Sequence, residues 1–292
     1  MKRLGISVCA VIVSATLAGR VQGQGGFRGG GPGGAGGGAS AIEHVTVHGS
    51  ALDGIRGESA DRQVTIYLPA SYRGDQARRY PVVYLLPGSG DRDNAFTGPL
   101  ANLQASADRL GSAAGFSSPI VVAPNALPPI AGNDSNATAW EKFIAEDLVA
   151  FIDMRYRTIA GRISRGLAGY STGGSNVLRI GMKRSGVFSS LYMMSPDLQP
   201  GANAEWLMMV ESNAENLKKC YAIAIDIGSK DPSLAAARQL KEALVRLKVP
   251  HSYEEYDGDS TNRLNERIDR NLLPFFSKVL AASANPTSPA VQ

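Results

Sequence analysis

The sequence predicts an α/β fold with a mostly parallel central sheet and helices on both faces. Short apolar runs, typical of strands buried on both faces, alternate with segments whose apolar residues recur at helical spacing. This alternation runs over residues 41–280 without an internal repeat. One strand-to-helix junction, Gly169-Tyr170-Ser171-Thr172-Gly173, has the pattern Gly-x-Ser-x-Gly, which places a serine on a sharp turn.

The first half of this region predicts four strands and a long helix. Two segments alternate apolar and polar residues, as half-exposed strands do, and two are continuous apolar runs. A stretch with helical spacing of Phe143, Leu148, Phe151 and Ile152 follows. In chain order the strands are expected at 42–48, 63–68, 80–86 and 120–123, and the helix at 140–156.

The second half continues the alternation of strands and helices. A strand leads into the Gly-x-Ser-x-Gly turn, and a helix leaves it. Further strands are expected at 190–194, 221–228 and 251–256, after the first at 163–169. Helices are expected at 176–183, 234–247 and 264–280. Such alternation implies a parallel sheet that is covered on both faces.

The two ends of the chain differ from this region in composition. Residues 1–23 begin Met1-Lys2-Arg3, continue with an apolar run and end in small residues, which predicts a signal peptide and a secreted or periplasmic protein. The apolar run is shorter than the ~20 residues of a spanning helix, so no stable membrane insertion is expected after cleavage. Residues 24–40 form a glycine-rich linker, and 281–292 a flexible tail.

Charge and cysteine content exclude several kinds of protein. The net charge is +4, but Lys2, Arg3 and Arg20 belong to the predicted signal, which leaves about +1. This balance excludes an electrostatic nucleic-acid binder. Cys9 lies in the signal, so Cys220 has no partner for an internal disulfide.

Ser171 is the candidate nucleophile. Gly-x-Ser-x-Gly between a strand and a helix is the nucleophile elbow of α/β-hydrolases, and both flanking elements are predicted here. The alternative is an ordinary serine in a glycine-rich turn.

The candidate oxyanion hole lies after the strand at 80–86. The turn Pro87-Gly88-Ser89-Gly90 closes that strand, and Gly88 permits close approach of the backbone. An oxyanion hole combines one N–H from such a loop with one from the residue after the nucleophile, here Ser89 and Thr172. The alternative is a plain strand-to-helix turn.

Five segments resemble the putative-esterase family of α/β-hydrolases, which includes esterase D-like, feruloyl esterase-like, enterochelin esterase-like and mycolyltransferase-like proteins. They are 80–90, 140–158, 165–174, 225–231 and 253–258, and the likeness covers about residues 41–280. The resemblance implies Ser171 as nucleophile and Asp231 as the acid of the triad. Asp231 also follows the end of a buried strand, where ligands gather in such sheets, whereas Asp226 lies inside that strand and is the weaker candidate.

The chain departs from the family pattern at two positions. Pro87 stands where the family often has a histidine before the oxyanion glycine, and this change leaves the following N–H groups intact. The catalytic histidine of the family follows the last strand, and here Ser260 stands at or near that position. A serine cannot act as the general base that the triad requires.

The three histidines of the chain do not fill this role in the predicted fold. His251 alone follows the order Ser, acid, His, but it begins the last strand while the site lies beyond its end, roughly 20 Å away. His44 and His48 belong to the first strand, which is expected at a sheet edge.

No cofactor or metal is expected. The loop Asp257–Asn262 has the acidic spacing that begins a calcium loop, but it lacks the glycine at the sixth position and the glutamate at the twelfth. A solvated acidic turn is the preferred interpretation.

Two functions remain open from the sequence. One is a secreted hydrolase of carbohydrate or phenolic esters. The other is a non-catalytic protein that binds such a small-molecule or carbohydrate ester, because a serine hydrolase without a triad member loses up to ~10⁶-fold in turnover.

Overall fold

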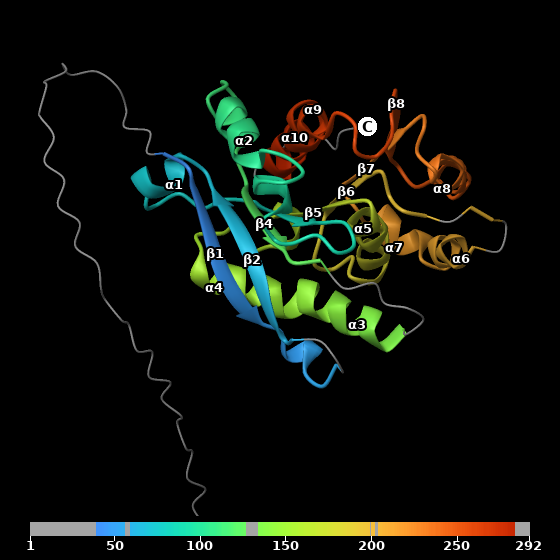
Figure 1. The fold of residues 1–292 in the computed structure, drawn as a ribbon, viewed down its shortest axis with the longest axis horizontal. Helices are drawn as coiled ribbons and strands as arrows, with labels where there is room; N and C mark the ends of the chain where they lie inside the picture. Colours follow the sequence, from blue (N-terminus) through green and yellow to red (C-terminus); the bar gives the residue numbers. More distant parts are fainter. Residues whose placement is uncertain (1–38, 56–58, 127–133, 199, 202–203, 284–292) are drawn as a thin grey trace, which may run out of the picture. The chain divides into compact units, whose positions relative to one another are not determined.

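The computed structural model describes residues 39–55, 59–126, 134–198, 200–201 and 204–283 (Figure 1). The predicted signal peptide and all but the end of the predicted linker lie outside these residues. The strands are β1 Ala41–His48, β2 Asp61–Leu68, β3 Val82–Leu86, β4 Ile120–Pro124, β5 Arg165–Tyr170, β6 Ser190–Met194, β7 Ala222–Gly228 and β8 Ser252–Tyr256. The helices are α1 Ser71–Gly74, α2 Leu103–Gly111, α3 Asp134–Lys142, α4 Val149–Arg155, α5 Thr172–Lys183, α6 Glu205–Ser212, α7 Ala214–Lys218, α8 Leu234–Arg246, α9 Leu264–Arg267 and α10 Leu273–Ser283.

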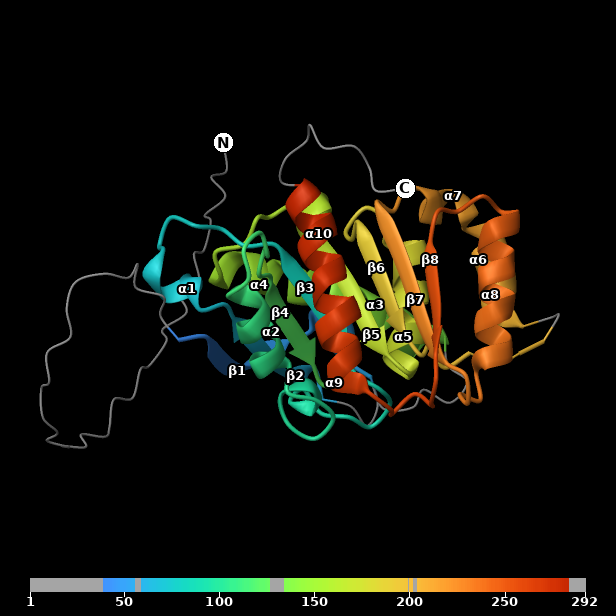
Figure 2. The same ribbon diagram turned by 90° about the horizontal axis from the view of Figure 1, so that it is seen from above.

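The strands form one sheet in the order β1-β2-β4-β3-β5-β6-β7-β8. β1 and β2 are antiparallel to their neighbours, and every pair from β4 to β8 is parallel. Figure 2 shows the strands from β4 to β8 side by side with their ends aligned. Because parallel strands end at the same edge, the loops after β3, β5, β6, β7 and β8 meet there.

Helices cover both faces of the sheet, as the sequence predicts (Figures 1 and 2). One face packs against α3, α4, α5 and α8 and contributes alternate residues such as Tyr84, Leu86 and Leu167. The other packs against α2, α9 and α10 through residues such as Val83 and Leu85. The burial of β3 on both sides explains its unbroken apolar sequence.

All eight predicted strands are present, with small changes of boundary. The prediction that residues 63–68 are half-exposed is wrong, because β2 is buried from Val64 onward. Both faces of β2 contribute to the core, with Val64, Ile66 and Leu68 in one hydrophobic cluster and Tyr67 in the other.

The predicted helices are less regular than expected. Both long ones contain a π-helical turn, at Phe143–Leu148 and at Ile268–Leu272. The helix after the elbow begins at Thr172 rather than at 176. Helices α1, α2, α6 and α7 were not predicted from the sequence, although Asn102 caps the start of α2 by accepting a hydrogen bond from the Ala105 N–H at 3.0 Å. The predicted start at residue 140 also missed most of α3.

The ends of the folded unit also differ slightly from the predicted boundaries. Ser40, assigned to the linker, donates a hydrogen bond to Asp108 at 2.7 Å and accepts one from Gln104 at 3.0 Å. At the other end α10 continues to Ser283, into the predicted tail. None of the described helices has the length and apolar character that crossing a bilayer requires.

Candidate active site

Ser171 lies at the junction between β5 and α5 with φ 54° and ψ −122°. A positive φ is strained for a residue with a Cβ, and such strain persists only where the surroundings hold it. Here the Ser171 N–H donates to the Met194 carbonyl at 3.0 Å, and its own carbonyl accepts from the Asp197 N–H at 3.1 Å. The turn therefore has the geometry of a nucleophile elbow, with a half-buried serine at its apex.

Two glycines of the motif are required by close backbone contacts. A Cβ built on Gly169 would lie 2.3 Å from the Gly173 carbonyl oxygen. A Cβ built on Gly173 would lie 2.2 Å from the carbonyl oxygen of Leu86, on the neighbouring strand. Neither contact can relax by moving a side chain, so only glycine lets α5 start this close to the sheet.

Gly173→Ala is therefore expected to reduce the free energy of unfolding by about 2–3 kcal/mol, the effect of forcing a methyl group into packed backbone. Gly186→Ala is the matched control, because nothing lies within 4 Å of a Cβ built there. Urea denaturation of both variants measures the difference. Equal stability would show that the junction between β5 and α5 is looser than described.

The two candidate oxyanion donors lie next to each other. The Ser89 N–H donates to the Thr172 hydroxyl at 2.5 Å, although the two residues are 83 positions apart in the chain. The Thr172 hydroxyl therefore accepts the hydrogen bond of the Ser89 N–H, the group that would bind an oxyanion. The hydroxyl has to rotate away before a substrate oxygen can accept from the Ser89 N–H. Gly88 lies against the nucleophile, since a Cβ built there would be 3.6 Å from the Ser171 Cβ.

Asp231 lies in the loop after β7, as predicted, and is 8% exposed. Its Oδ1 accepts a hydrogen bond from the Ser233 N–H at 2.8 Å, and the Ser233 hydroxyl accepts one from the Leu198 N–H at 3.3 Å. Leu198 follows Asp197, whose N–H binds the Ser171 carbonyl, so one chain of contacts joins this loop to the elbow. Burial raises the pKa of Asp231, while the Ser233 N–H and the Arg267 guanidinium partly lower it.

The loop that carries Ser260 lies beside the Asp231 loop. The Ser229 N–H donates to the Tyr256 carbonyl at 2.8 Å, and the Lys230 N–H to the Gly258 carbonyl at 2.8 Å. A Cβ on Gly228 would lie 2.3 Å from the Gly258 oxygen, so the two loops are in direct backbone contact. The structure therefore brings Ser260 and Asp231 to the same corner of the site.

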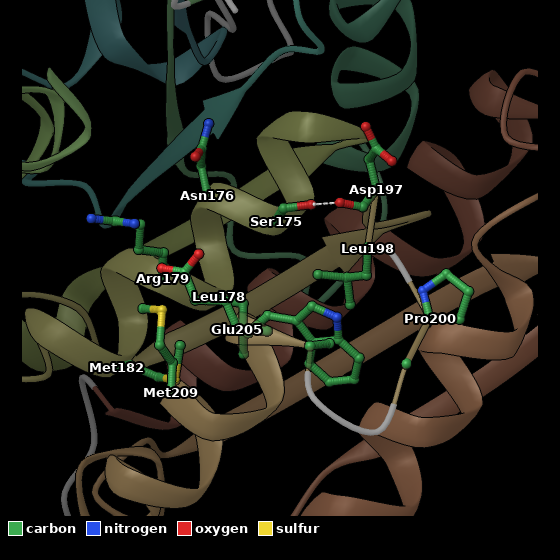
Figure 3. Close-up of a pocket in the computed structure, with 13 residues that line it drawn as sticks. Ser175, Asn176, Leu178, Arg179, Met182, Asp197, Leu198, Pro200, Glu205 and Met209 are labelled. Carbon is green, nitrogen blue, oxygen red and sulfur yellow. Dashed lines mark hydrogen bonds between the residues drawn. The ribbon is translucent and has the colours of Figure 1, made fainter. Parts of the chain in front are cut away.

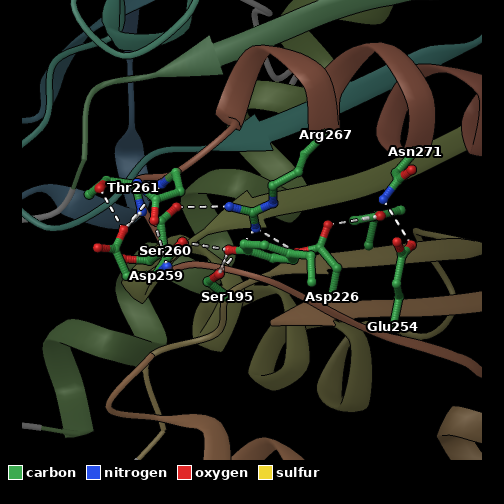
Figure 4. A network of polar contacts seen from close by, with 11 residues as sticks. Ser195, Asp226, Glu254, Asp259, Ser260, Thr261, Arg267 and Asn271 are labelled. Carbon is green, nitrogen blue, oxygen red and sulfur yellow. Dashed lines mark hydrogen bonds and ion pairs between the residues drawn. The ribbon is translucent and has the colours of Figure 1, made fainter. Parts of the chain in front are cut away.

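A buried arginine, Arg267, connects the Ser260 loop to β7 (Figure 4). Arg267, which is 4% exposed, points from α9 toward β7 and forms an ion pair of 2.5 Å with Asp226. The same guanidinium donates to the Ser260 carbonyl at 2.8 Å and to the Ser195 hydroxyl at 3.1 Å. It also lies 4.4 Å from the centre of the Tyr256 ring.

Both carboxylate oxygens of Asp226 are bonded within this network. Its second oxygen accepts a hydrogen bond from the Tyr192 hydroxyl at 3.0 Å, and it is completely buried. The sequence analysis ranked Asp226 below Asp231 as the triad acid because of its place inside the strand. The contacts give Asp226 a structural partner instead, whereas Asp231 lies in the loop beside the candidate site.

The histidines lie away from this corner. His44 and His48 are on β1, the edge strand, four strand spacings or roughly 19 Å from β5. They contact Asp93 at 3.5 Å and Asp61 at 2.8 Å, respectively. His251 precedes β8 and its Nδ1 lies 2.8 Å from the Val249 carbonyl oxygen, at the opposite end of the strand from Ser260.

In the acidic loop after β8, the Asp259 carboxylate accepts hydrogen bonds from groups of the same loop. Asp259 Oδ1 accepts hydrogen bonds from the Thr261 N–H at 2.9 Å, the Thr261 hydroxyl at 2.7 Å and the Asn262 N–H at 3.2 Å. The Thr261 contacts hold the pKa of Asp259 below its ordinary value. The loop is a hydrogen-bonded turn, and in the part of the chain that the structure describes, no group of three His, Cys, Asp or Glu residues is placed to hold a metal ion.

A pocket of about 740 Å³ lies between α5 and α6, and its lining reaches Ser175 and Asp197 near the elbow but does not include Ser171 (Figure 3). Ser175 and Asp197 form its upper rim and are joined by a hydrogen bond of 2.5 Å. The apolar part of its wall comes from Leu178, Met182, Leu198, Trp206 and Met209. Its size and lining suit a small molecule with an apolar group.

This pocket and the Arg267 network were not predicted from the sequence. The pocket is lined by α6, a helix that was not predicted. The sequence held a weak indication that Arg267 is buried. It comes three positions after Leu264 and directly before Ile268, so it falls on the apolar side of its helix.

Comparisons with known proteins agree with this architecture. The family model described as putative esterase matches residues 59–264. A ferulic acid esterase has 23% sequence identity, with 82% of this chain and 98% of that chain covered, and a TM-score of 0.71. A variant of the feruloyl esterase module from Clostridium thermocellum, complexed with sinapinate, has 20% identity, 83% and 89% coverage, and a TM-score of 0.66. The S-formylglutathione hydrolase FrmB from Staphylococcus aureus has 15% identity, 82% and 98% coverage, and a TM-score of 0.64.

Proposed function

We propose that this chain, which belongs to the putative esterase family, is a carboxylic-ester hydrolase that uses Ser171 as its nucleophile. The observation that carries the proposal is the strained turn at Ser171, with φ 54°. The half-buried Ser171 hydroxyl forms no hydrogen bond with any described residue, so it is free to meet a substrate. Strain of this kind is retained at functional sites.

The oxyanion of the reaction would be held by the N–H groups of Ser89 and Thr172. Both groups lie beside the elbow, and the Thr172 hydroxyl covers the first of them until a substrate displaces it. Backbone donors aimed at a developing oxyanion contribute about 10²–10³-fold to turnover.

The substrate we propose is an ester of a phenolic or carbohydrate compound. The pocket between α5 and α6 begins at Ser175, one helical turn from the nucleophile, and its wall includes Trp206 and Leu198. An aromatic ring can pack against such a wall. Among similar structures, one is a ferulic acid esterase and another contains sinapinate. Ferulic acid and sinapinate are both phenolic acids.

We also propose that the protein is exported. The support is the composition of residues 1–23, with Lys2 and Arg3 before an apolar run. These residues lie outside the part of the chain that the structure describes.

Reaction with a fluorophosphonate probe tests the nucleophile. Slow labelling is expected at Ser171, because no histidine lies beside it to take its proton, and Ser171→Ala should abolish it. Ser175→Ala is the matched control, since Ser175 is on the same turn of α5 but donates to the Asp197 carbonyl. Labelling that persists in Ser171→Ala would contradict the serine mechanism.

The second candidate function is an esterase-like protein that binds its ester without turning it over. The observation that favours it is the Arg267 network, which packs a structural ion pair directly under the position of the absent histidine. Calorimetric titration with methyl ferulate, combined with an assay of its hydrolysis, separates the two functions. Binding without hydrolysis in both the wild type and Ser171→Ala would support the binding protein.

A further inference from the structure

Asp91 lies unexpectedly close to the nucleophile. Its N–H donates to the Gly88 carbonyl at 3.2 Å, which turns the loop after β3 back on itself. A Cβ built on Gly88 would lie 2.9 Å from Asp91 Oδ2 and 3.6 Å from the Ser171 Cβ. The carboxylate oxygen and the Ser171 Cβ are therefore at most about 6.5 Å apart, and a proton passing between the carboxylate and the Ser171 hydroxyl would travel through a bridging water.

The backbone around Asp91 is fixed, but its carboxylate has no hydrogen bond from the side chain of any residue that the structure describes. The Ala126 N–H donates to the Asp91 carbonyl at 3.0 Å, and the Asp93 N–H donates to Asn125 Oδ1 at 2.8 Å. Among the described residues, no side chain donates a hydrogen bond to the Asp91 carboxylate. The Asp91 carboxylate is therefore half-buried, without a side-chain donor among the described residues, on the loop that lies against Ser171.

The surroundings of Asp91 favour a basic carboxylate. Burial raises its pKa above the ordinary value, and the Gly88 N–H partly offsets this. A carboxylate with a raised pKa is a better proton acceptor near neutral pH. The charged or titratable groups on the elements around it are His44, which lies 3.5 Å from Asp93, together with Arg62, Arg92, Asp93 and Tyr170.

These neighbours have other partners or are exposed. Arg62 donates to the Ala126 carbonyl at 2.7 Å, and Asp93 accepts from the Thr65 hydroxyl at 2.6 Å. Arg92 is exposed. In contrast, Asp231 is influenced by Arg267, Asp197 and Asp259 together.

We propose that Asp91 is the general base of this site and takes the proton of Ser171 in place of the absent histidine. The inference rests on the proposed ester hydrolysis. As the Ser171 oxygen bonds to the carbonyl carbon, its proton passes to Asp91. When the carbon–oxygen bond to the alcohol breaks, the alcohol oxygen takes that proton. A water molecule then attacks the acyl carbon and gives its proton to Asp91, and the Ser171 oxygen leaves with it, which releases the carboxylic acid.

Asp91→Asn tests this role, with fluorophosphonate labelling of Ser171 and hydrolysis of methyl ferulate as readouts. Both rates are expected to fall by about tenfold or more, since a positioned base contributes at least that much. The matched control is Asp93→Asn, the same change on the same loop, which should stay within about twofold. Thermal unfolding confirms that each variant folds.

The pH dependence of labelling gives a second readout. Asp91 acts as a base only when deprotonated, so the wild-type rate should fall as the pH drops through its raised pKa. Asp91→Asn should lose this acid limb, and Asp91→Glu should retain it.

Three results would overturn the inference. Unchanged labelling and an unchanged acid limb in Asp91→Asn would remove Asp91 from the reaction while leaving Ser171 as nucleophile. Loss of labelling in Asp197→Asn, with Asp91→Asn unaffected, would assign the base to the other carboxylate next to the elbow. Absence of labelling in the wild type would overturn the proposed function as well as the base.

Discussion

Ser260→His is expected to raise ester hydrolysis by roughly 10²-fold or more, because a correctly placed imidazole is a stronger general base than a carboxylate. Ser260 lies in the loop that is bonded through its backbone to the Asp231 loop. Arg267 holds this loop by the Ser260 carbonyl rather than by its side chain, so the substitution leaves the anchor in place. Because Ser260 is half-buried, a larger side chain can reach toward Asp231 without entering the core.

Turnover of methyl ferulate measures the gain, and two backgrounds identify its origin. The gain should vanish with Ser171→Ala, and it should shrink with Asp231→Asn, because Asp231 orients the imidazole. Asp259→His tests whether the position of the base is shifted by one residue. If neither histidine variant changes turnover by more than about twofold in a folded protein, this loop does not face the nucleophile.

Arg267→Met is expected to lower the free energy of unfolding by about 3–5 kcal/mol, because it leaves the carboxylate of Asp226 buried without its countercharge. The side chains of Arg267 and Asp226 are 4% and 1% exposed. The same change removes the donor to the Ser260 carbonyl and the cation that lowers the pKa of Asp231. The loop beside the nucleophile should therefore loosen as the protein loses stability.

Arg270→Met is the matched control on the adjoining turn of the same helical segment. Its ion pair with Glu266 is 2.8 Å long, but the Arg270 side chain is 75% exposed. Exposed pairs contribute about 0–1 kcal/mol, so this variant should unfold close to the wild type in urea. The double variant Asp226→Asn/Arg267→Met should recover part of the loss, because the buried charge is gone. Equal stability of Arg267→Met and Arg270→Met would show that the buried pair is not needed.

The predictions that depended on local sequence pattern agree with the structure. The apolar run at residues 80–86 indicated a strand buried on both faces, and β3 at Val82–Leu86 lies in the middle of the sheet. The motif at Gly169–Gly173 predicted a sharp turn, and the positive φ of Ser171 and the contacts of Gly173 provide it. In both cases a few consecutive residues are enough to determine the local structure.

Contacts between side chains of distant elements could not be predicted from the sequence in the same way. Ser89 was identified as a backbone donor, but its N–H is covered by the hydroxyl of Thr172. The absence of the family histidine was visible at Ser260, but the arginine packed beneath that loop was not.

The sequence by itself determined the α/β fold and the place of Ser171 on its turn, and it led to the expectation that no histidine assists this serine. These follow from hydrophobic periodicity, from glycines that backbone contacts require, and from simple residue identity. Only the tertiary structure decided that Arg267 pairs with Asp226, 41 positions away, and that Asp91 approaches Ser171. The physical reason is that such contacts join side chains from different elements, whose distances are set by the packing of helices against the sheet and leave no periodic trace along the chain.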